Sequence, residues 1–195
     1  AYSGTATSTS VLSTSTAMIG RAMSFDGVND CVKGSTAVNL LGSSNDVTIS
    51  IWTKPNSSQQ GYANLFDARN GVTGGFMVEQ SNPLQFCFGY RKAHGDSATL
   101  ISGSNCTYLT ANVWQHFVIA KSGVNVDFYL NGVKQNTAVF NSPIIYRVND
   151  YWTIGCLYGN MRYFNGLIDE VKIWNYARSA EQIKQDYDRG LRGSP

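Results

Sequence analysis

The chain has 195 residues, of which 43% are hydrophobic and only 14% charged, and its formal net charge is +2. The charged fraction is well below the ~25% of an average soluble domain, which excludes a charged tail, a coiled coil and a conventional disordered chain. Fifteen Lys and Arg against 13 Asp and Glu create no field that would favour nucleic acid. Aromatic residues at 12%, with 19 Gly and only 4 Pro, favour an all-β domain of short strands and tight turns.

The first twenty residues differ in composition from the rest. Residues 1–20 contain ten Ser or Thr and no charged residue, which predicts a poorly ordered lead-in or an exposed edge strand. No window approaches the ~18 apolar residues of a membrane helix, and no signal peptide is evident. The chain starts at Ala1, so we expect a mature, processed or excised polypeptide. We predict one domain over residues 21–190 and a linker or terminal tail at 191–195.

Alternating apolar residues predict the first strands. In residues 47–53, Val47, Ile49 and Ile51 share one face while Trp52 lies on the other, which indicates a strand buried on one side. We assign Trp114 and Trp174 to the core. Further short strands are expected at 65–66, 75–78 and 84–88.

The segment 113–139 gives the strongest local signal. Asn131-Gly132 stands between two apolar alternating runs and predicts a type I′ hairpin turn, since both central residues need a positive φ. Strands are also expected at 152–155 and 166–174. Ser179 and Gln182 form a capping box for one short C-terminal helix, which Gly190 is expected to end. These elements predict a two-sheet antiparallel jelly-roll sandwich with one C-terminal helix.

The four cysteines leave their chemistry open. They contain no CxxC motif, which argues against a zinc site. Cys87 and Cys106 flank a predicted hairpin and could pair, whereas four buried reduced thiols are an equally acceptable interpretation. Cys31 and Cys156 could pair with one another or simply pack.

Five phrases, in order and spanning about residues 20–190, resemble the laminin-G-like and pentraxin-like jelly rolls of the concanavalin A-like lectin/glucanase superfamily. Together they are specific for the fold but not for a function, because this fold carries lectins, adhesion modules and polysaccharide enzymes. The phrases are AMSFDGVND at 22–30, VTISIWTKP at 47–55, WQH at 114–116, FYLNG at 128–132 and FNGLIDEVKIWN at 164–175.

The acidic residues do not predict catalysis. The glycan-cleaving members that the chain resembles carry two Glu a few residues apart on one strand, as nucleophile and acid. This chain has only three Glu, and Glu79, Glu170 and Glu181 lie far apart in sequence. Asp67 has no alternating partner. His116 matches a strand His of the family, which we interpret as packed and hydrogen-bonded. The family also has a Trp at the position of Trp52 whatever its ligand, so the resemblance implies packing rather than ligand binding for Trp52. We therefore predict a domain that is not an enzyme.

The resemblance also implies a structural Ca²⁺ between the first and last strands. Asp169 would be its carboxylate ligand, and the turn containing Asp26 would supply carbonyls or its own side chain. Ca²⁺ takes six to eight oxygen ligands and tolerates irregular geometry, so such a site is chemically reasonable. The alternative is that Asp169 only accepts hydrogen bonds from the opening turn.

Predicted loops supply the candidate ligand-binding residues. The loop with Asp67, Arg69 and Asn70 resembles a ligand loop of pentraxins, although Asx turns are a commoner reason for such residues. Two other loops combine Tyr with Arg, which suits the CH-rich faces and hydroxyls of glycans, and ordinary surface is the alternative. The residues of these two loops are Tyr90, Arg91, Tyr158, Arg162 and Tyr163.

We therefore expect a non-catalytic carbohydrate-binding or adhesion module of a larger extracellular, cell-surface or virion protein. Its partner would be a glycan or glycoconjugate, or a protein surface, with no nucleic acid and no membrane insertion. The alternative is a structural or protein-interaction domain that binds no glycan. A polysaccharide hydrolase or lyase is disfavoured by the distribution of Glu residues. The ligand and the oligomeric state stay open.

Overall fold

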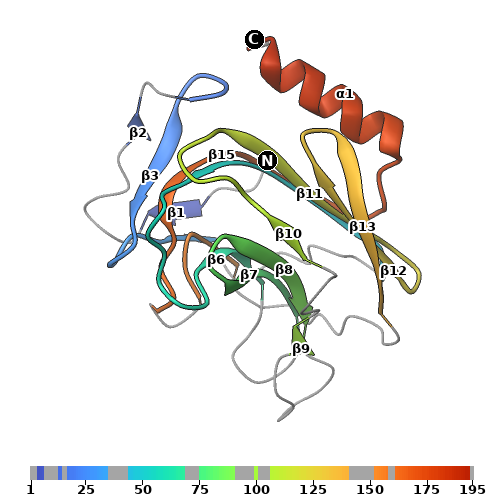
Figure 1. Ribbon diagram of the computed structural model, residues 1–195, viewed down its shortest axis with the longest axis horizontal. Helices are drawn as coiled ribbons and strands as arrows, with labels where there is room; N and C mark the ends of the chain where they lie inside the picture. Colours follow the sequence, from blue (N-terminus) through green and yellow to red (C-terminus); the bar gives the residue numbers. More distant parts are fainter. Residues whose placement is uncertain are drawn as a thin grey trace.

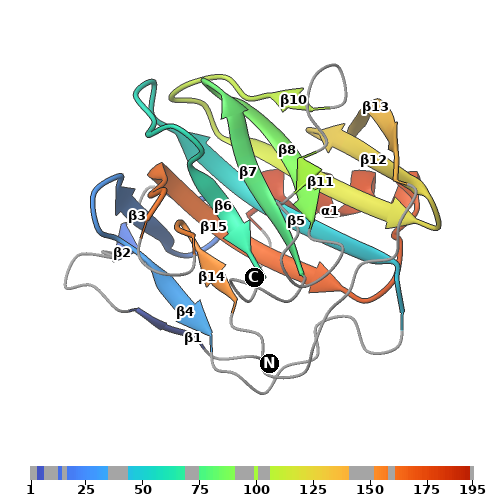
Figure 2. The ribbon, with the colours of Figure 1, turned by 90° about the horizontal axis from the view of Figure 1, so that it is seen from below.

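The computed structural model describes residues 4–6, 13–14, 17–34, 44–68, 75–90, 99–100, 106–140, 152–157 and 161–193. These residues form two antiparallel sheets that face one another (Figures 1 and 2), which confirms the predicted sandwich. The first sheet has, in spatial order, β1 (Gly4–Ala6), β4 (Val32–Gly34), β14 (Thr153–Ile154), β6 (Asn64–Asp67), β7 (Phe76–Asn82), β8 (Gln85–Tyr90) and β10 (Thr107–Tyr108), while β9 (Thr99–Leu100) also pairs with β8. The second has β13 (Val133–Val139), β12 (Asn125–Leu130), β11 (Gln115–Ser122), β5 (Val47–Pro55), β15 (Asn165–Trp174), β3 (Ala22–Asp26) and β2 (Ser13–Thr14). Residues 1–20 thus contribute an edge strand to each sheet.

The space between the sheets is filled by aromatic and branched aliphatic side chains. All nine phenylalanines of the chain belong to this core, and several meet edge-on, such as Phe25 and Phe164 with ring centroids 6.3 Å apart. Edge-to-face contacts of this kind add stabilisation beyond the burial of apolar area. Because the core uses every Phe, the aromatic residues that reach the surface are mainly tyrosines.

Helix α1 (Ala180–Leu191) covers part of the outer face of the second sheet (Figure 1). It begins at the predicted capping box, in which Ser179 and Gln182 exchange hydrogen bonds. The predicted stop at Gly190 was wrong, because the helix continues to Leu191 and Gly193 takes the positive φ of +58°. Gly190 has a different role: it lies against the Trp52 ring, where a Cβ atom would collide with the indole.

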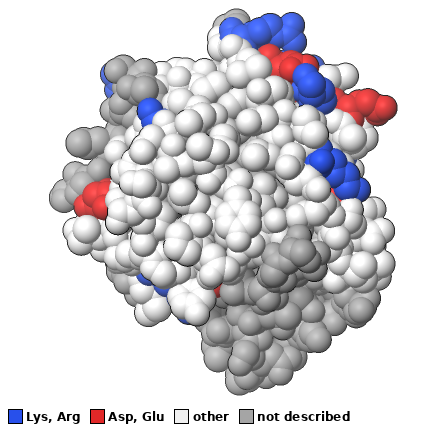
Figure 3. All heavy atoms as spheres, viewed as in Figure 1, with Lys and Arg blue, Asp and Glu red and all other residues white. Residues whose placement is uncertain are grey.

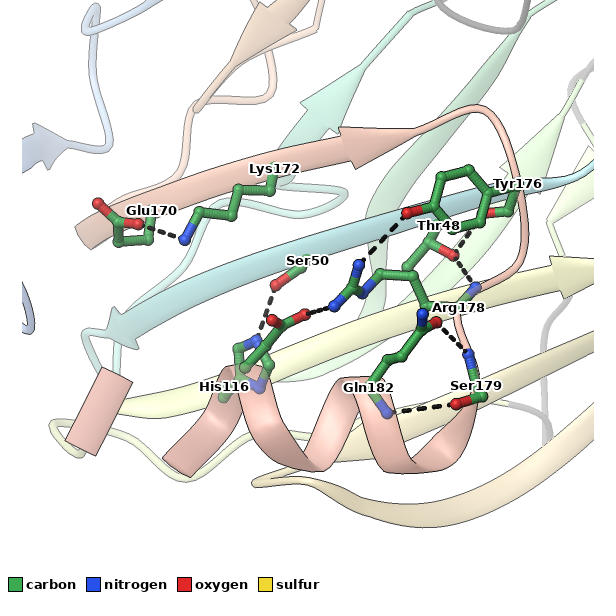
Figure 4. Close-up of polar contacts among 10 residues, drawn as sticks. Thr48, Ser50, His116, Glu170, Lys172, Tyr176, Arg178, Ser179 and Gln182 are labelled. Carbon is green, nitrogen blue, oxygen red and sulfur yellow. Dashed lines mark hydrogen bonds and ion pairs between the residues drawn. The ribbon is translucent and has the colours of Figure 1, made fainter. Parts of the chain in front are cut away.

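The helix explains why β5 is buried on both faces although its sequence alternates. Trp52 is only 3% exposed and stacks on His116 and on Tyr187 of α1, with centroids 5.0 and 5.6 Å apart. His116 lies 2.7 Å from the Ser50 hydroxyl, and Arg178 pairs with Asp186 at 2.8 Å (Figure 4). Trp52 and His116 are therefore packing residues, as predicted. Charged side chains gather over this helix, while most of the other described side chains on that face are uncharged (Figure 3).

The hairpin turns match the sequence, whereas two tryptophans do not lie where they were expected. Asn131 and Gly132 both have positive φ, +53° and +76°, as a type I′ turn requires. Trp114 and Trp174 are half-buried rather than in the core. The Trp174 ring instead lies beneath the Arg178 guanidinium, whose carbon is 4.3 Å from the ring centroid.

The four cysteines form two disulfide bonds, which settles the alternatives left open by the sequence. Cys31 is bonded to Cys156, with Cα atoms 5.4 Å apart, and Cys87 to Cys106, with Cα atoms 4.6 Å apart. Cys31–Cys156 closes a separation of 125 residues and joins the start of the domain to the strand region near its end. In the described ranges, no helix combines the length and the apolar character that crossing a membrane requires.

Candidate ligand-binding rim

Three loops meet at one end of the sandwich, and we call residues 26–31, 56–63 and 161–164 the rim. Asp26 pairs in register with Asn165 at the start of β15, and the Asn56 amide donates to the Asn165 carbonyl at 3.0 Å. The Asn64 amide in turn donates to the Arg162 carbonyl at 3.0 Å. The teal β5–β6 loop and the orange segment before β15 accordingly lie side by side in Figures 1 and 2. Strand register thus brings together segments that are distant in sequence.

Side-chain amides hold the rim loops to one another. The Asn165 backbone amide donates to Gln59 Oε1 at 2.9 Å, and the Gln59 side chain donates back to the Asn165 carbonyl. Gln60 bridges the other two loops, since its Nε2 donates to the Gly27 carbonyl at 2.6 Å and its Oε1 accepts from the Tyr163 amide at 3.2 Å. These bonds fix three loops without using charges, so the rim is organised before any ligand arrives.

An exposed tyrosine and an arginine form the centre of the rim. The Tyr62 residue is 52% exposed, and the Arg162 guanidinium carbon lies 4.9 Å from the centroid of its ring. Arg162 Nη1 is 2.5 Å from Oε2 of Glu79 on β7, a carboxylate that also accepts from Asn64 Nδ2 at 3.2 Å. The side chain of Glu79 is 2% exposed and that of Arg162 is 35% exposed. The buried carboxylate therefore positions a guanidinium that remains accessible.

The backbone of these two residues supports the view that the rim is built for contact. Tyr62 and Arg162 have φ of +63° and +57°, the left-handed region that favours glycine. Such conformations cost on the order of 1 kcal/mol each and occur preferentially at ligand sites. Val28 and Met161, which are 64% and 51% exposed, extend the accessible apolar surface of the rim. The rim offers a flat ring, a planar cation and amides, which can stack on a ligand and exchange hydrogen bonds with hydroxyls.

The predicted ligand residues do not form one site. Arg162 and Tyr163 lie in the rim, but Asp67 is buried at the opposite end of β6. Tyr90 is the last residue of β8 and pairs with Phe76, which places it at the same end of the sheet as Asp67. The remaining predicted residues lie outside the described ranges; they are Arg69, Asn70, Arg91 and Tyr158.

Sequence reasoning missed Tyr62 and Gln60. The signal available for them was the run Gln59-Gln60-Gly61-Tyr62, which combines planar amides with an aromatic residue in an uncharged loop. The sequence also gave no indication that Glu79, which appeared isolated, would support Arg162.

Asp67 has no second carboxylate in alternation on its own strand, but the neighbouring strand carries one. Asp67 pairs with Met77, so Glu79 lies two residues further along the same face of the neighbouring strand. Diagonal neighbours of this kind have backbones about 7–8 Å apart. Glu79 is engaged by Arg162 and Asn64, which favours a role in positioning the guanidinium over a role in acid–base catalysis.

The two carboxylates predicted to bind calcium do not share a site. Asp26 pairs with Asn165, so Asp169 lies four residues, about 13 Å, further along β15. Asp169 Oδ2 accepts from the Met18 and Ile19 amides, both at 3.0 Å. Among the described residues, no three His, Cys, Asp or Glu side chains could hold a metal ion together. The Asp26 and Asp169 side chains are therefore too far apart to ligate one calcium ion together, whereas calcium binding by Asp169 with backbone carbonyls stays a prediction.

Asp169→Asn tests whether this carboxylate is a hydrogen-bond acceptor or a calcium ligand. Its oxygens accept three backbone amides, including that of Glu170 at 2.8 Å, and one oxygen of Asn cannot replace both. We expect the free energy of unfolding to fall by about 1–2 kcal/mol. Urea unfolding in calcium and in EDTA should give the same loss. A loss seen only in calcium would show that Asp169 binds the cation.

The Arg162–Glu79 pair predicts a measurable coupling. Arg162→Met keeps much of the apolar stem but removes the cation from a buried carboxylate. The free energy of unfolding should fall by about 2–3 kcal/mol, which is less than for a fully buried pair because Arg162 is partly exposed. Adding Glu79→Gln to Arg162→Met should restore about 1–2 kcal/mol of the lost free energy of unfolding, because the buried carboxylate without a cation is then removed. Chemical unfolding of the single and double variants measures this coupling energy, and strictly additive losses would contradict it.

Comparison with known proteins identifies the fold. A family model described as the concanavalin A-like lectin/glucanases superfamily matches residues 26–184. The structure of domain 4 of AbnA, an extracellular arabinanase from Geobacillus stearothermophilus, in complex with arabinotriose is similar, with a TM-score of 0.68, 19% identity, and coverage of 86% of this chain and 76% of that one. No match was found among the curated proteins.

Two toxin structures are similar as well. The binding domain of Paraclostridial Mosquitocidal Protein 1 has a TM-score of 0.74 at 16% identity, covering 100% of this chain and 51% of that one. The structure of botulinum neurotoxin type C, whose cell entry depends on interaction with two ganglioside molecules, has a TM-score of 0.71 at 14% identity. The match covers 97% of this chain and 47% of that one. The chain spans about half the length of these two structures. At such identities the similarity establishes the fold, and confirms the predicted jelly roll.

Proposed function

Because the chain belongs to the concanavalin A-like lectin/glucanase superfamily, we propose that it is a non-catalytic carbohydrate-binding module whose ligand contacts the rim. The observation that carries this proposal is the exposed Tyr62 ring beneath the Arg162 guanidinium, held by buried Glu79. An aromatic face stacks on the CH groups of a sugar, and the guanidinium and amides beside it bond to hydroxyls.

The similar structures support binding rather than catalysis. They include a domain of an arabinanase with bound arabinotriose and binding domains of bacterial toxins, among them a botulinum neurotoxin DC domain in complex with SialylT. The two disulfides agree with an oxidising, extracellular setting. These observations support the proposal that the module belongs to a larger extracellular, cell-surface or virion protein.

Glycan-array binding, followed by calorimetry on any glycan that binds, tests the proposal. Tyr62→Ala should weaken binding about tenfold or more, since removing an aromatic platform costs about 1–3 kcal/mol. Tyr176→Ala is the matched control, because Tyr176 is 45% exposed and follows the opposite end of β15. Equal losses in both variants, or no binding by the parent protein, would contradict the proposal.

A protein partner is the second candidate. Val28 and Met161 are exposed in the other two rim loops and add apolar surface that sugars do not require. A protein contact that Tyr62→Ala abolishes, together with an array without binding, would favour this candidate over a lectin.

A further inference from the structure

The charged side chains of the rim limit which ligands it can bind. Among the described rim residues, Asp26 is an exposed carboxylate, Asp30 is buried and accepts from the Asp26 amide at 2.8 Å, and Arg162 is the cation. The charge of Arg162 is compensated by Glu79 at 2.5 Å. Lys54 precedes the rim but, by strand alternation, shares the outer face of the second sheet with Trp52. No unpaired cation therefore faces a ligand from the described rim.

Asp26 supplies negative charge at the surface. It is exposed, and its Oδ1 accepts from the Val28 and Asn29 amides at 2.7 and 3.1 Å. Slight burial opposes ionisation, but the backbone hydrogen bonds together lower the pKa of Asp26 below its ordinary value. The carboxylate is thus ionised at neutral pH.

The second rim tyrosine lies in the field of this carboxylate. Burial, and then the charge of Asp26, raise the pKa of the Tyr163 hydroxyl. Tyr163 therefore keeps its proton and can donate it to a sugar hydroxyl. The rim donors that remain for a ligand are this hydroxyl, the second N–H of the Gln60 side chain and the exposed part of the Arg162 guanidinium, whose charge Glu79 compensates.

We infer that the rim selects neutral, hydroxyl-rich glycans and disfavours acidic ones such as sialylated or uronate-containing chains. This inference rests on the proposed function. A sugar carboxylate at the rim would lose hydration, meet Asp26 and find no unpaired cation among the described residues, whereas a hydroxyl can both donate and accept. Gln60 is exposed and has one N–H and one lone pair beyond the bonds that it makes within the rim, and these suit a hydroxyl in the same way.

The test compares neutral glycans with their acidic counterparts on the intact chain. Probes are galactose-terminated oligosaccharides with and without terminal sialic acid, and oligogalacturonides with methyl-esterified or free carboxylates. We expect each neutral form that binds to do so about tenfold more tightly than its acidic counterpart at low salt. Asp26→Asn should narrow that ratio to about threefold or less, and so should salt added to the parent protein.

The outcomes separate this inference from the proposed function. If acidic glycans bind as tightly as the neutral forms or more tightly, the selectivity is wrong while carbohydrate binding stands. If no glycan of either kind binds, the proposed function fails and the selectivity with it. The salt titration uses the unaltered chain, so it remains informative should Asp26→Asn perturb the turn.

Discussion

Replacing Cys31 and Cys156 together by Ala is expected to lower the free energy of unfolding by about 5 kcal/mol. The bond joins residues separated by 125 positions, and the entropy that such a cross-link removes from the unfolded chain grows with the loop it closes. The loss is comparable to the whole stability of a small domain, ~5–15 kcal/mol. The variant should therefore be only marginally folded at 25 °C.

The second disulfide provides a matched control. Cys87 and Cys106 are separated by only 19 positions, for which the same relation gives about 3 kcal/mol. Urea unfolding at 25 °C, followed by tryptophan fluorescence, measures both losses, and near-ultraviolet circular dichroism shows whether each variant retains its packing. Equal losses, or a larger loss for the Cys87–Cys106 variant, would contradict loop-closure entropy as the main source of stabilisation.

Local sequence patterns predicted the fold correctly where the structure depends only on residues close together in the sequence. The alternation in residues 47–53 predicted β5, and Asn131-Gly132 predicted a turn with two positive φ values. Both features follow from side-chain direction and backbone sterics within a few residues. The capping box at Ser179 succeeded for the same reason.

Long-range packing accounts for the errors in the fold. Alternation placed Trp52 away from the main core but could not show that α1, more than a hundred residues later, covers that face. Gly190 looked like a helix end, but it is glycine because the Trp52 ring leaves no room for a Cβ atom. A glycine fixed by a distant side chain has no signature in a single sequence.

The candidate site likewise combines features that local sequence patterns predict with features that depend on long-range packing. The sequence predicted a loop at Arg162 and Tyr163, and both residues do precede β15, while their role in binding stays a prediction. Asp67, a candidate from another loop, lies at the opposite end of β6, and only the pairing with β7 reveals which end each residue occupies. The Glu79 that supports Arg162 comes from that same pairing, 83 residues away in the chain.

Stability is expected to rise with pH between about 4 and 6.5 because of His116. Burial first, and then the charge of Lys172 on β15, lower the pKa of His116 from 6.5 to about 4. In this window the unfolded chain binds a proton that the folded chain does not, so acidification favours unfolding. A shift of this size corresponds to about 3 kcal/mol between pH 7 and pH 4. The stacked rings of Trp52 and Tyr187 leave little room for a hydrated imidazolium.

His116→Asn isolates this contribution. Asn retains a polar group for Ser50, whose hydroxyl lies 2.7 Å from the His116 Nε2 atom, but does not titrate. The difference in unfolding free energy between parent and variant should change by about 3 kcal/mol from pH 7 to pH 4. The chain has two histidines, so one imidazole resonance should titrate near pH 4 in the NMR spectrum. If the variant shows the parent's full pH dependence, carboxylates rather than the buried imidazole set the acid stability of the sandwich.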